Sequence, residues 1–382
     1  MTSSPGTVND VILQKYHVRL KGTSISGIGI GSATVYLLGI PLSEPFVISL
    51  GTQNDYNGVV VELNSASNTG YGEGSTIAQI TGEVPWALYE SVKHLVIGLN
   101  GKAIEDMEGL SHYLDASMYG NPVAKNAVDI ATHDLICKEY GISISALLGG
   151  SMKKLPTSYT IPIGDVESNL RELENFQKIK VRIIKVKVGT DVTADIQRVR
   201  AISSRLQGEK FYVDANQGYD LRDAVTLGKV LSDEGALFFE QPLGRHDWNA
   251  HKELRERIDV PITLDESISS PGDVIEAILH GAADMINVKL TKSGGIRGAS
   301  KTLITAQAYG IKAMVGCMIE SKLGIAASHA VASSFDNVAY TDLDGFQSIS
   351  RQPFGGGVEF VDGFNIPVNG NGMAVRKLAK NW

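Results

Sequence analysis

Short apolar runs rich in β-branched residues recur along the second half of the chain, and successive runs begin 24 to 27 residues apart. Between them lie stretches in which apolar residues follow helical spacing. Eight such strand-and-helix units are the number in a closed (β/α)8 barrel of the α/β class. The expected strands begin near Ser158, Ile183, Lys210, Leu237, Pro261, Met285, Lys312 and Val338, and the expected helices span residues 194–206, 220–231, 273–279, 296–308 and 323–332.

Charged residues fall at the C-terminal tip of almost every expected strand. A strand that is buried on both faces rarely contains a charged residue unless another group compensates the charge. The charged strand ends therefore indicate a functional site. An open, doubly wound parallel sheet is the alternative fold. Such a sheet concentrates its ligands at one switch point, and the even spread of charged tips therefore favours the barrel. We expect the barrel to span residues 156–344.

Residues 29–155 follow a different pattern, which predicts an α+β domain. Its glycine-rich segments, 49–58 and 70–82, are expected to be mobile loops that cover the barrel mouth. Residues 1–28 have no strong period and are treated as an N-terminal extension. In the α+β domain, strands are expected at 33–38 and 59–63, and helices at 85–99, 104–113 and 123–140, the last entered through Asn121 as cap and Pro122 in the first turn.

The composition narrows the function classes. At 382 residues the chain is too long for one ordinary core and suits a barrel with a second domain. The net charge is −7 without a basic stripe, which disfavours nucleic acid and anionic membranes as partners. No apolar run reaches the roughly 18 residues that span a bilayer, and the N-terminus lacks signal-peptide features, so we expect a cytoplasmic protein. Cys137 and Cys317 predict reduced, buried thiols.

Lys185 and Lys187 alternate with apolar residues in the second expected strand. In an extended strand they point to one face, here the barrel interior, about 6 to 7 Å apart. Mutual repulsion and partial burial are expected to lower both lysine pKa values toward the range of a general base. The alternative is a basic strand edge in solvent, which the apolar neighbours Ile183, Ile184 and Val188 disfavour.

Three carboxylates, Asp214, Glu240 and Asp265, end the next three expected strands. Together they would repel one another strongly, so they must share a cation. Three oxygen ligands without a nearby His or Cys favour Mg²⁺, with Mn²⁺ as a substitute. The alternative is that each carboxylate caps a helix or pairs with a lysine. None of the eight histidines falls at a strand end, and we interpret all of them as structural or surface residues.

Lys289 ends the sixth expected strand, roughly opposite the second strand in an eight-membered ring. A metal between two lysines suits removal of a proton next to a carboxylate. The metal would stabilise the enediolate, one lysine would remove the α-proton, and the other would return a proton to the opposite face. This arrangement predicts racemisation or epimerisation.

These motifs, together with the Leu-Thr-Lys-Ser-Gly-Gly-Ile that follows Lys289, resemble the muconate-lactonizing subgroup of the enolase superfamily from about Gly29 to the C-terminus. The resemblance implies Mg²⁺ on the three carboxylates, Lys187 and Lys289 as the two acid/bases and Lys185 as an assisting group. It also implies that residues 29–155 are a capping domain and that the segment 345–382 returns to it.

The end of the eighth strand discriminates within the subgroup. Asp342 and Asp344 resemble the pair by which dipeptide epimerases hold the ammonium group of their substrate. The alternative is a turn with two solvated aspartates. The resemblance also implies substrate contacts at Thr160, Ile80, Gly51 and Met318.

One position departs from the subgroup. Where Ala-Glu epimerases carry an arginine in the first capping loop, this chain has Gly51. A buried glutamate without that cation would be costly, so we expect an uncharged rather than acidic second residue.

Three functions stay open at this point. The first is Mg²⁺-dependent epimerisation of dipeptides, a 1,1-proton transfer at the α-carbon of the C-terminal residue. The substrate would be a small-molecule dipeptide, and we expect the enzyme to be a homo-oligomer. The second is an o-succinylbenzoate synthase or muconate-type cycloisomerase, which would not need Asp342 and Asp344. The third is a non-catalytic binding protein, which the complete set of lysines and carboxylates disfavours.

Overall fold

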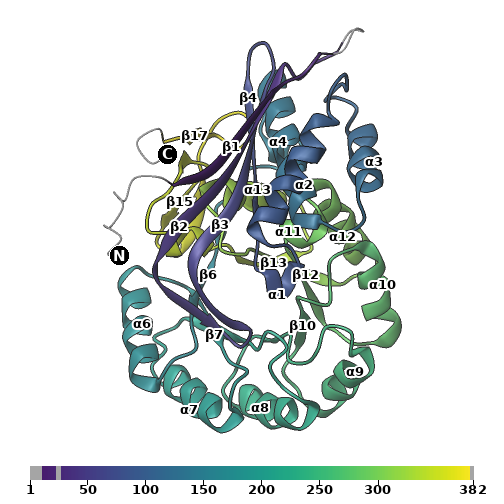
Figure 1. Ribbon diagram of the computed structural model, residues 1–382. Helices are drawn as coiled ribbons and strands as arrows, with labels where there is room; N and C mark the ends of the chain where they lie inside the picture. Colours follow the sequence, from purple (N-terminus) through teal and green to yellow (C-terminus); the bar gives the residue numbers. More distant parts are fainter. Residues whose placement is uncertain (1–10, 23–26, 379–382) are drawn as a thin grey trace, which may run out of the picture.

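An antiparallel sheet with helices packed on it lies above a ring of parallel strands surrounded by helices (Figure 1). The structure is a computed structural model that describes residues 11–22 and 27–378. The antiparallel sheet has the order β1-β2-β3-β4 and consists of β1 (Ile12–Arg19), β2 (Ser32–Ile48), β3 (Gly51–Asn64) and β4 (Thr69–Ser75). The helices of this part are α1 (Ala78–Thr81), α2 (Pro85–Ile97), α3 (Met107–Ser117), α4 (Pro122–Tyr140) and α5 (Ile144–Leu147).

Strand β1 lies inside the predicted N-terminal extension and pairs with β2. The division of the chain into an extension (1–28), an α+β domain (29–155), a barrel (156–344) and a C-terminal segment (345–382) stays a prediction.

The segment 49–58, expected to be a mobile loop, is instead a two-residue turn followed by the first half of β3, which begins at Gly51. It pairs with β2 as a long hairpin from Ile48 opposite Gly51 back to Ser32 opposite Asn64. The polar and glycine residues belong to a hairpin arm that reaches out over the barrel (Figure 1). This prediction was wrong because an exposed hairpin arm has the same composition as a loop.

The glycines of the segment 70–82 serve close packing. Gly70, Gly72 and Gly74 lie on one face of β4 against α4, and a Cβ at Gly72 would come within 2.0 Å of the Ala127 carbonyl oxygen. Only glycine allows a helix to approach a strand this closely. The prediction of a mobile loop was therefore wrong for residues 70–75, which belong to β4, while α1 follows in the remainder.

Helix α4 begins where the sequence predicts it, but its cap is different. Asn121 has φ 52° and its side chain makes no capping hydrogen bond. The buried carboxylate of Glu83 accepts hydrogen bonds from the amides of Val123 and Ala124, at 2.9 and 3.1 Å. A carboxylate at a helix N-terminus satisfies free amides and complements the helix dipole. The cap comes from a distant segment and had no local sequence signal.

The eight parallel strands form the predicted barrel in consecutive order from β6 to β13. Hydrogen bonds from the Thr160 amide to Asp344 and from the Leu343 amide to Thr157 Oγ1 join its two ends. The strands are β6 (Ser158–Ile161), β7 (Ile183–Lys187), β8 (Lys210–Asp214), β9 (Phe239–Glu240), β10 (Ile262–Leu264), β11 (Met285–Val288), β12 (Lys312–Gly316) and β13 (Val338–Asp342). The helices are α6 (Val166–Lys178), α7 (Val192–Ser203), α8 (Leu221–Asp233), α9 (Trp248–Arg257), α10 (Pro271–His280), α11 (Leu290–Ser293), α12 (Ile296–Ala308) and α13 (Lys322–Ala332).

Three of these helices, α6, α9 and the four-residue α11, were not among the predicted ones. The barrel interior is filled away from the charged tips by a separate apolar layer, which consists of Ile183, Tyr212, Phe238, Met285 and Met314. This packed floor leaves the charged strand ends at one mouth.

The segment after the barrel contacts both parts of the molecule. It contains η1 (Gly345–Ser348), β14 (Phe354–Gly356), β15 (Val358–Val361), β16 (Phe364–Pro367) and β17 (Val375–Lys377), and β16 pairs with β5 (Leu155–Pro156). Leu42 of β2 forms a bridge with Ile349, and Met373 donates its amide to Asp134 of α4.

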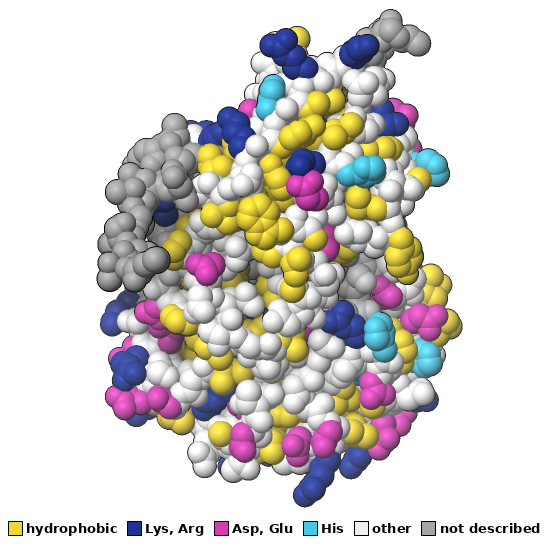
Figure 2. All heavy atoms as spheres, viewed as in Figure 1, with side chains coloured by type: hydrophobic (Ala, Val, Ile, Leu, Met, Phe, Trp, Pro, Cys, Tyr) yellow, Lys and Arg dark blue, Asp and Glu magenta, His cyan; other side chains and the backbone are white. Residues whose placement is uncertain are grey.

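On the surface, Figure 2 shows Lys and Arg side chains scattered among acidic ones on this face rather than gathered in a stripe. Within residues 11–22 and 27–378, no helix combines the length and the apolar character needed to cross a membrane.

Candidate active site

A cavity of about 330 Å³ opens at the C-terminal ends of the barrel strands, beneath the β2–β3 hairpin and α1. Its wall combines the predicted lysines and aspartates with apolar side chains from both parts of the molecule. The residues of the sequence prediction that line it are Ile80, Thr160, Lys185, Lys187, Lys289, Met318, Asp342 and Asp344.

Gly51 does not line this cavity. It is an exposed residue at the start of β3, with φ 133° and nothing within 4 Å of a Cβ placed on it. The neighbouring Leu50 packs instead against Ile77, Ile80 and Met318. The expected contact of Gly51 with a substrate is therefore not supported by its position, and the hairpin approaches the mouth through Leu50.

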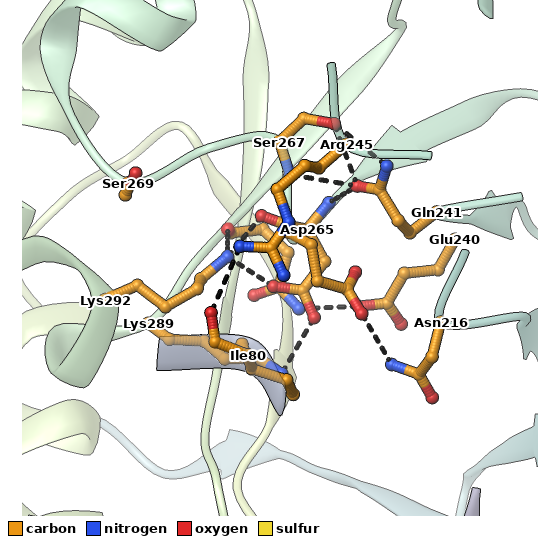
Figure 3. A network of polar contacts seen from close by, with 12 residues as sticks. Ile80, Asn216, Glu240, Gln241, Arg245, Asp265, Ser267, Ser269, Lys289 and Lys292 are labelled. Carbon is orange, nitrogen blue, oxygen red and sulfur yellow. Dashed lines mark hydrogen bonds and ion pairs between the residues drawn. The ribbon is translucent and has the colours of Figure 1, made fainter. Parts of the chain in front are cut away.

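Asp214, Glu240 and Asp265 lie together against the three lysines that line the cavity, and all three acids are fully buried. One carboxylate oxygen of each lies within 4.8 Å of the others. Figure 3 shows Glu240 and Asp265 facing one another, with Asn216 and Lys289 beside them. Successive barrel strands bring the tips together although the residues are about 25 apart in sequence. The predicted gathering of the three carboxylates is present.

The same carboxylates fit a divalent cation. Glu240 Oε2 and Asp265 Oδ2 are buried and accept no hydrogen bond, although an ammonium nitrogen lies 3.1 Å and 2.8 Å away, respectively. Buried oxygens normally have hydrogen-bond partners, and a hard cation with oxygen ligands satisfies such a set. Of the alternative reading, the pairing with lysines is present for all three carboxylates. Neither helix capping nor lysine pairing alone accounts for oxygens of three acids that converge on one point.

Burial and neighbouring charges shift the pKa values of the three acids in different directions. Burial, followed by the negative charge of Asp214, raises the pKa of Glu240 to about 8. Burial also opposes ionisation of Asp214, but the ammonium groups of Lys187 and Lys185 hold its pKa well below the usual range. Lys289 and Lys292 have the same effect on the pKa of Asp265.

Lys185 lies inside an acidic cage rather than beside a repelling lysine alone. Its Nζ is 2.6 Å from Asp342 Oδ2, 3.0 Å from Asp214 Oδ2 and 3.1 Å from Glu240 Oε2. Burial lowers the pKa of Lys185, but these carboxylates outweigh it and raise the pKa well above its usual value. The predicted lowering was therefore wrong for Lys185, because the prediction counted the neighbouring lysine and not the acids from other strands.

Lys187 and Lys289 enter the cavity from strands four positions apart in the ring of eight. Lys187 donates to Asp214 at 2.7 Å and to Asn216 Oδ1 at 2.8 Å. Lys289 Nζ lies 2.8 Å from Asp265 Oδ2. Burial lowers the pKa of Lys289, but the charge of Asp265 outweighs it, and the net shift is upward. Two ammonium groups thus flank the carboxylates from opposite sides.

Asp342 and Asp344 both line the cavity but differ in their contacts. Asp342 is 3 % exposed and accepts hydrogen bonds from Lys185 and from Ser158 Oγ. Asp344 accepts the Thr160 amide at 2.9 Å, and burial followed by the charge of Asp342 raises its pKa to about 6. A turn with two solvated aspartates does not describe this pair.

The sequence prediction missed several polar residues that support the acids. Lys292 donates to the backbone and side-chain oxygens of Asp265, and Asn216 donates to Glu266 at 3.0 Å. Gln241 Oε1 accepts the Asp265 amide at 2.8 Å (Figure 3). Each of the four lies within three residues of a predicted site residue in sequence, which is the signal that could have identified them.

Arg245 fastens α1 over this site. Its guanidinium donates to the carbonyls of Ile80 at 3.1 Å and Gln79 at 3.2 Å, and its amide donates to Gln217 at 3.0 Å. Figure 3 shows the side chain reaching from its loop to Ile80. The last carbonyls of a helix need such partners, and α1 has only four residues. Arg245 therefore connects the cavity wall at Ile80 to the loops that follow β8 and β9.

Replacing Arg245 with alanine is expected to raise KM about 3- to 10-fold with a smaller change in kcat, since the net free energy of such hydrogen bonds is roughly 0.5–1.5 kcal/mol. Steady-state kinetics checks the split between KM and kcat. Arg255→Ala, which removes a surface ion pair with Asp284, is the matched control. An unchanged KM in the Arg245 variant would contradict a positioning role.

Comparison with known families identifies the chain. Residues 32–149 match the family described as mandelate racemase/muconate lactonizing enzyme, N-terminal domain, and residues 169–377 match the enolase C-terminal domain-like family. The chain belongs to the enolase superfamily. The predicted barrel with its separate antiparallel-sheet domain is confirmed as the fold of this superfamily.

Relatives refine this assignment. The chain is 32 % identical to an L-Ala-D/L-Glu epimerase of Clostridium acetobutylicum over 89 % of this chain and 97 % of the relative. A dipeptide epimerase from Enterococcus faecalis in complex with Mg and the dipeptide L-Leu-L-Tyr is 30 % identical, with a TM-score of 0.87 over 94 % of this chain and 99 % of that one.

A muconate lactonizing enzyme from Pseudomonas fluorescens in complex with muconolactone is 26 % identical, with a TM-score of 0.89 over 93 % and 98 % of the two chains. The predicted isomerase class is confirmed. The TM-scores of the two structures are nearly equal, so the overall fold does not distinguish an epimerase from a lactonizing enzyme. The distinction has to come from the residues of the site.

Proposed function

We propose that this member of the enolase superfamily is a Mg²⁺-dependent dipeptide epimerase that inverts the α-carbon of the second residue. The observation that carries this proposal is that Lys187 and Lys289 flank the acidic triad while Asp342 and Asp344 line the same cavity. The Mg-bound dipeptide epimerase of Enterococcus faecalis supports it. A homo-oligomeric state and a cytoplasmic location stay predictions.

Asp214, Glu240 and Asp265 would hold Mg²⁺, with Mn²⁺ as a possible substitute. The ion would neutralise the carboxylate of the substrate and thereby make the adjacent α-proton more acidic. Lys185, within 3.1 Å of two of these acids, adds positive charge where the negative charge develops. The bound ion and Lys185 together would place positive charge next to the substrate carboxylate.

Lys187 and Lys289 would exchange the proton at the α-carbon. In a 1,1-proton transfer, the neutral amine of one lysine takes the proton from one face and the ammonium of the other lysine donates a proton to the opposite face. The two lysines exchange these roles when the reaction runs from the other epimer. Asn216, which accepts a hydrogen bond from Lys187, fixes the direction in which that amine points.

Asp342 and Asp344 would receive the ammonium group of the dipeptide. They provide two carboxylates at the β13 end of the cavity. An o-succinylbenzoate synthase or a muconate-type cycloisomerase acts on substrates without an ammonium group, so it gains nothing from this pair. The aspartates therefore favour the epimerase over these alternatives.

Asp344→Asn is expected to raise KM and to lower kcat/KM for dipeptides by roughly 10- to 100-fold, because an ammonium left without its charged partner costs on the order of 1–3 kcal/mol. The Thr160 amide can still donate to the remaining amide oxygen, so the loop should keep its conformation. Steady-state kinetics on one dipeptide checks the effect. A variant with wild-type kcat/KM would contradict ammonium binding at Asp344.

We also propose that the second residue is uncharged rather than acidic. Leu50, Ile77, Ile80 and Met318 form an apolar cluster beside the cavity, and Gly51 supplies no cation. A glutamate side chain would be buried there without a partner. L-Ala-L-Glu should therefore be a poorer substrate than L-Ala-L-Leu, and matched steady-state kinetics decides between them.

A library of L,L-dipeptides incubated with the Mg²⁺-loaded protein in D₂O tests the function directly. Epimerisation introduces one deuterium at the α-carbon, which mass spectrometry detects as a gain of one mass unit. Uptake into one group of dipeptides supports the proposal. No uptake into any dipeptide, together with turnover of the o-succinylbenzoate precursor or of muconate, would assign the alternative function.

A further inference from the structure

One arm of the cavity extends away from the catalytic lysines, past Thr160, toward helix α6. The arm lies between residues 162–176, which follow β6, and residues 43–46 of β2. Its walls include the apolar side chains of Phe46, Ile163 and Phe176. We refer to this space as the α6 arm.

Two carboxylates, Glu44 and Glu172, also line the α6 arm. Burial raises the pKa of Glu172, and the negative charge of Glu44 raises it further, so the two side chains are close enough to repel. Among the described residues, neither glutamate forms an ion pair with a Lys, Arg or His. Arg171, next to Glu172 in sequence, is 2.6 Å from Glu167 instead. The arm therefore combines apolar walls with two carboxylates that have no cationic side chain beside them among the described residues; Glu44 is exposed and Glu172 is partly buried.

A bulge in β2 brings Glu44 to this position. Pro41 pairs with Asp55 and Phe46 pairs with Gln53, so four residues of β2, 42–45, face the single residue Asn54 of β3. Bulges of this kind redirect side chains and are frequent next to active sites. A regular hairpin would not direct this part of β2 toward α6.

We propose that the first residue of the dipeptide substrate carries a cationic side chain, that of lysine or arginine, which occupies the α6 arm with its charged end between Glu44 and Glu172. This inference rests on the proposed function. Lysine and arginine side chains have an apolar stem and a charged end, which matches apolar walls that lead to two carboxylates. A neutral apolar side chain would gain no attraction from the two carboxylates, and an acidic one would be repelled.

The position of the arm assigns it to the first residue rather than the second. Asp344, the proposed partner of the ammonium group, accepts the amide of Thr160. The chain that continues from Thr160 through Ile163 forms the wall of the arm and then enters α6 with Glu172. The side chain next to the ammonium group therefore has the shortest path into the arm, whereas the second residue lies between the two lysines.

Steady-state kinetics with four dipeptides tests the proposal: L-Lys-L-Ala, L-norleucyl-L-Ala, L-Glu-L-Ala and L-Ala-L-Lys. Norleucine has the stem of lysine without its charge, so it isolates the electrostatic contribution. We expect kcat/KM for L-Lys-L-Ala to exceed that for the norleucine analogue about 10-fold or more and that for L-Glu-L-Ala about 100-fold. The preference should weaken as ionic strength rises.

The double variant Glu44→Gln, Glu172→Gln should reduce the ratio of kcat/KM for L-Lys-L-Ala to that for the norleucine analogue about 10-fold. Glu174→Gln, an exposed site on the same helix and outside the cavity wall, is the control and should keep the wild-type ratio. Because the readout is a ratio, a general loss of folded protein does not change it.

The outcomes separate this inference from the proposed function. Turnover of the norleucine analogue at least as fast as that of L-Lys-L-Ala would overturn the inference while the epimerase function stands. A charge preference found with L-Ala-L-Lys and not with L-Lys-L-Ala would also overturn it, because the cation would then belong to the second residue. No deuterium uptake into any of the four dipeptides or the wider library would overturn the epimerase function itself.

Discussion

Replacing Lys289 with methionine is expected to slow epimerisation by roughly 10²- to 10⁴-fold, the usual contribution of a positioned general acid or base. Methionine keeps much of the length of the side chain but cannot carry the proton. Lys187 remains on the opposite side of the α-carbon, so the variant should still exchange the α-proton of one epimer with D₂O. Lys187→Met should show the opposite stereochemical preference.

Proton exchange followed by ¹H NMR on each pure epimer distinguishes these outcomes. The control is Lys301→Met, which changes an exposed lysine on α12 and should leave both exchange rates at the wild-type value. A Lys289 variant that interconverts the epimers at the wild-type rate would contradict the two-base assignment. Loss of exchange from both epimers in both variants would contradict the assignment of one lysine to each face.

The barrel could be predicted from sequence because its signal is local and repeated. Most strands lie in short apolar runs, such as Ile183–Lys187, and the partner of each strand in space is the next run along the chain. The tips of such strands must meet at one mouth, so the predicted convergence of Asp214, Glu240 and Asp265 followed from the fold class alone. Helices α6 and α9 escaped prediction because both are polar on average. In α6 the apolar residues Leu170, Leu173 and Phe176 do follow helical spacing, and this signal was overlooked.

Features that depend on distant segments could not be predicted. The cap of α4 is Glu83, and the glycines of β4 are required by the backbone of α4, about 55 residues away in sequence. The pKa of Lys185 was predicted in the wrong direction for the same reason. Its sequence neighbour is Lys187, but its nearest charges in space are Asp342, Asp214 and Glu240 from three other strands.

The charge balance of the site explains why the lysines and acids occur together. Lys185, Lys187, Lys289 and Lys292 surround three buried carboxylates, and each lysine lies within hydrogen-bond distance of at least one of them. Isolated buried charges are costly, so each set stabilises the other in the folded chain. Removing one member leaves the opposite charges around it less compensated, and substitutions here therefore need a readout beyond activity.

Removal of divalent cations is expected to abolish turnover, and added Mg²⁺ is expected to restore it, because the substrate carboxylate would otherwise face Glu240 and Asp265 directly. Mg²⁺ should also raise the midpoint of thermal unfolding, since an ion that binds only the folded chain stabilises it. Asp265→Asn should weaken Mg²⁺ binding at least about 10-fold, the lower end of the loss seen when even an outer partner of a metal ligand is changed.

Isothermal titration with Mg²⁺ and the thermal shift that Mg²⁺ produces measure this without reference to activity. Because Asp265 also neutralises Lys289 and Lys292, Glu240→Gln provides an independent variant, whose amide oxygen can still accept the hydrogen bond from Asn287. Asp233→Asn, at the exposed end of α8, is the control and should bind Mg²⁺ like the wild type. Full turnover after exhaustive chelation, or wild-type Mg²⁺ affinity in both site variants, would remove the metal from the mechanism.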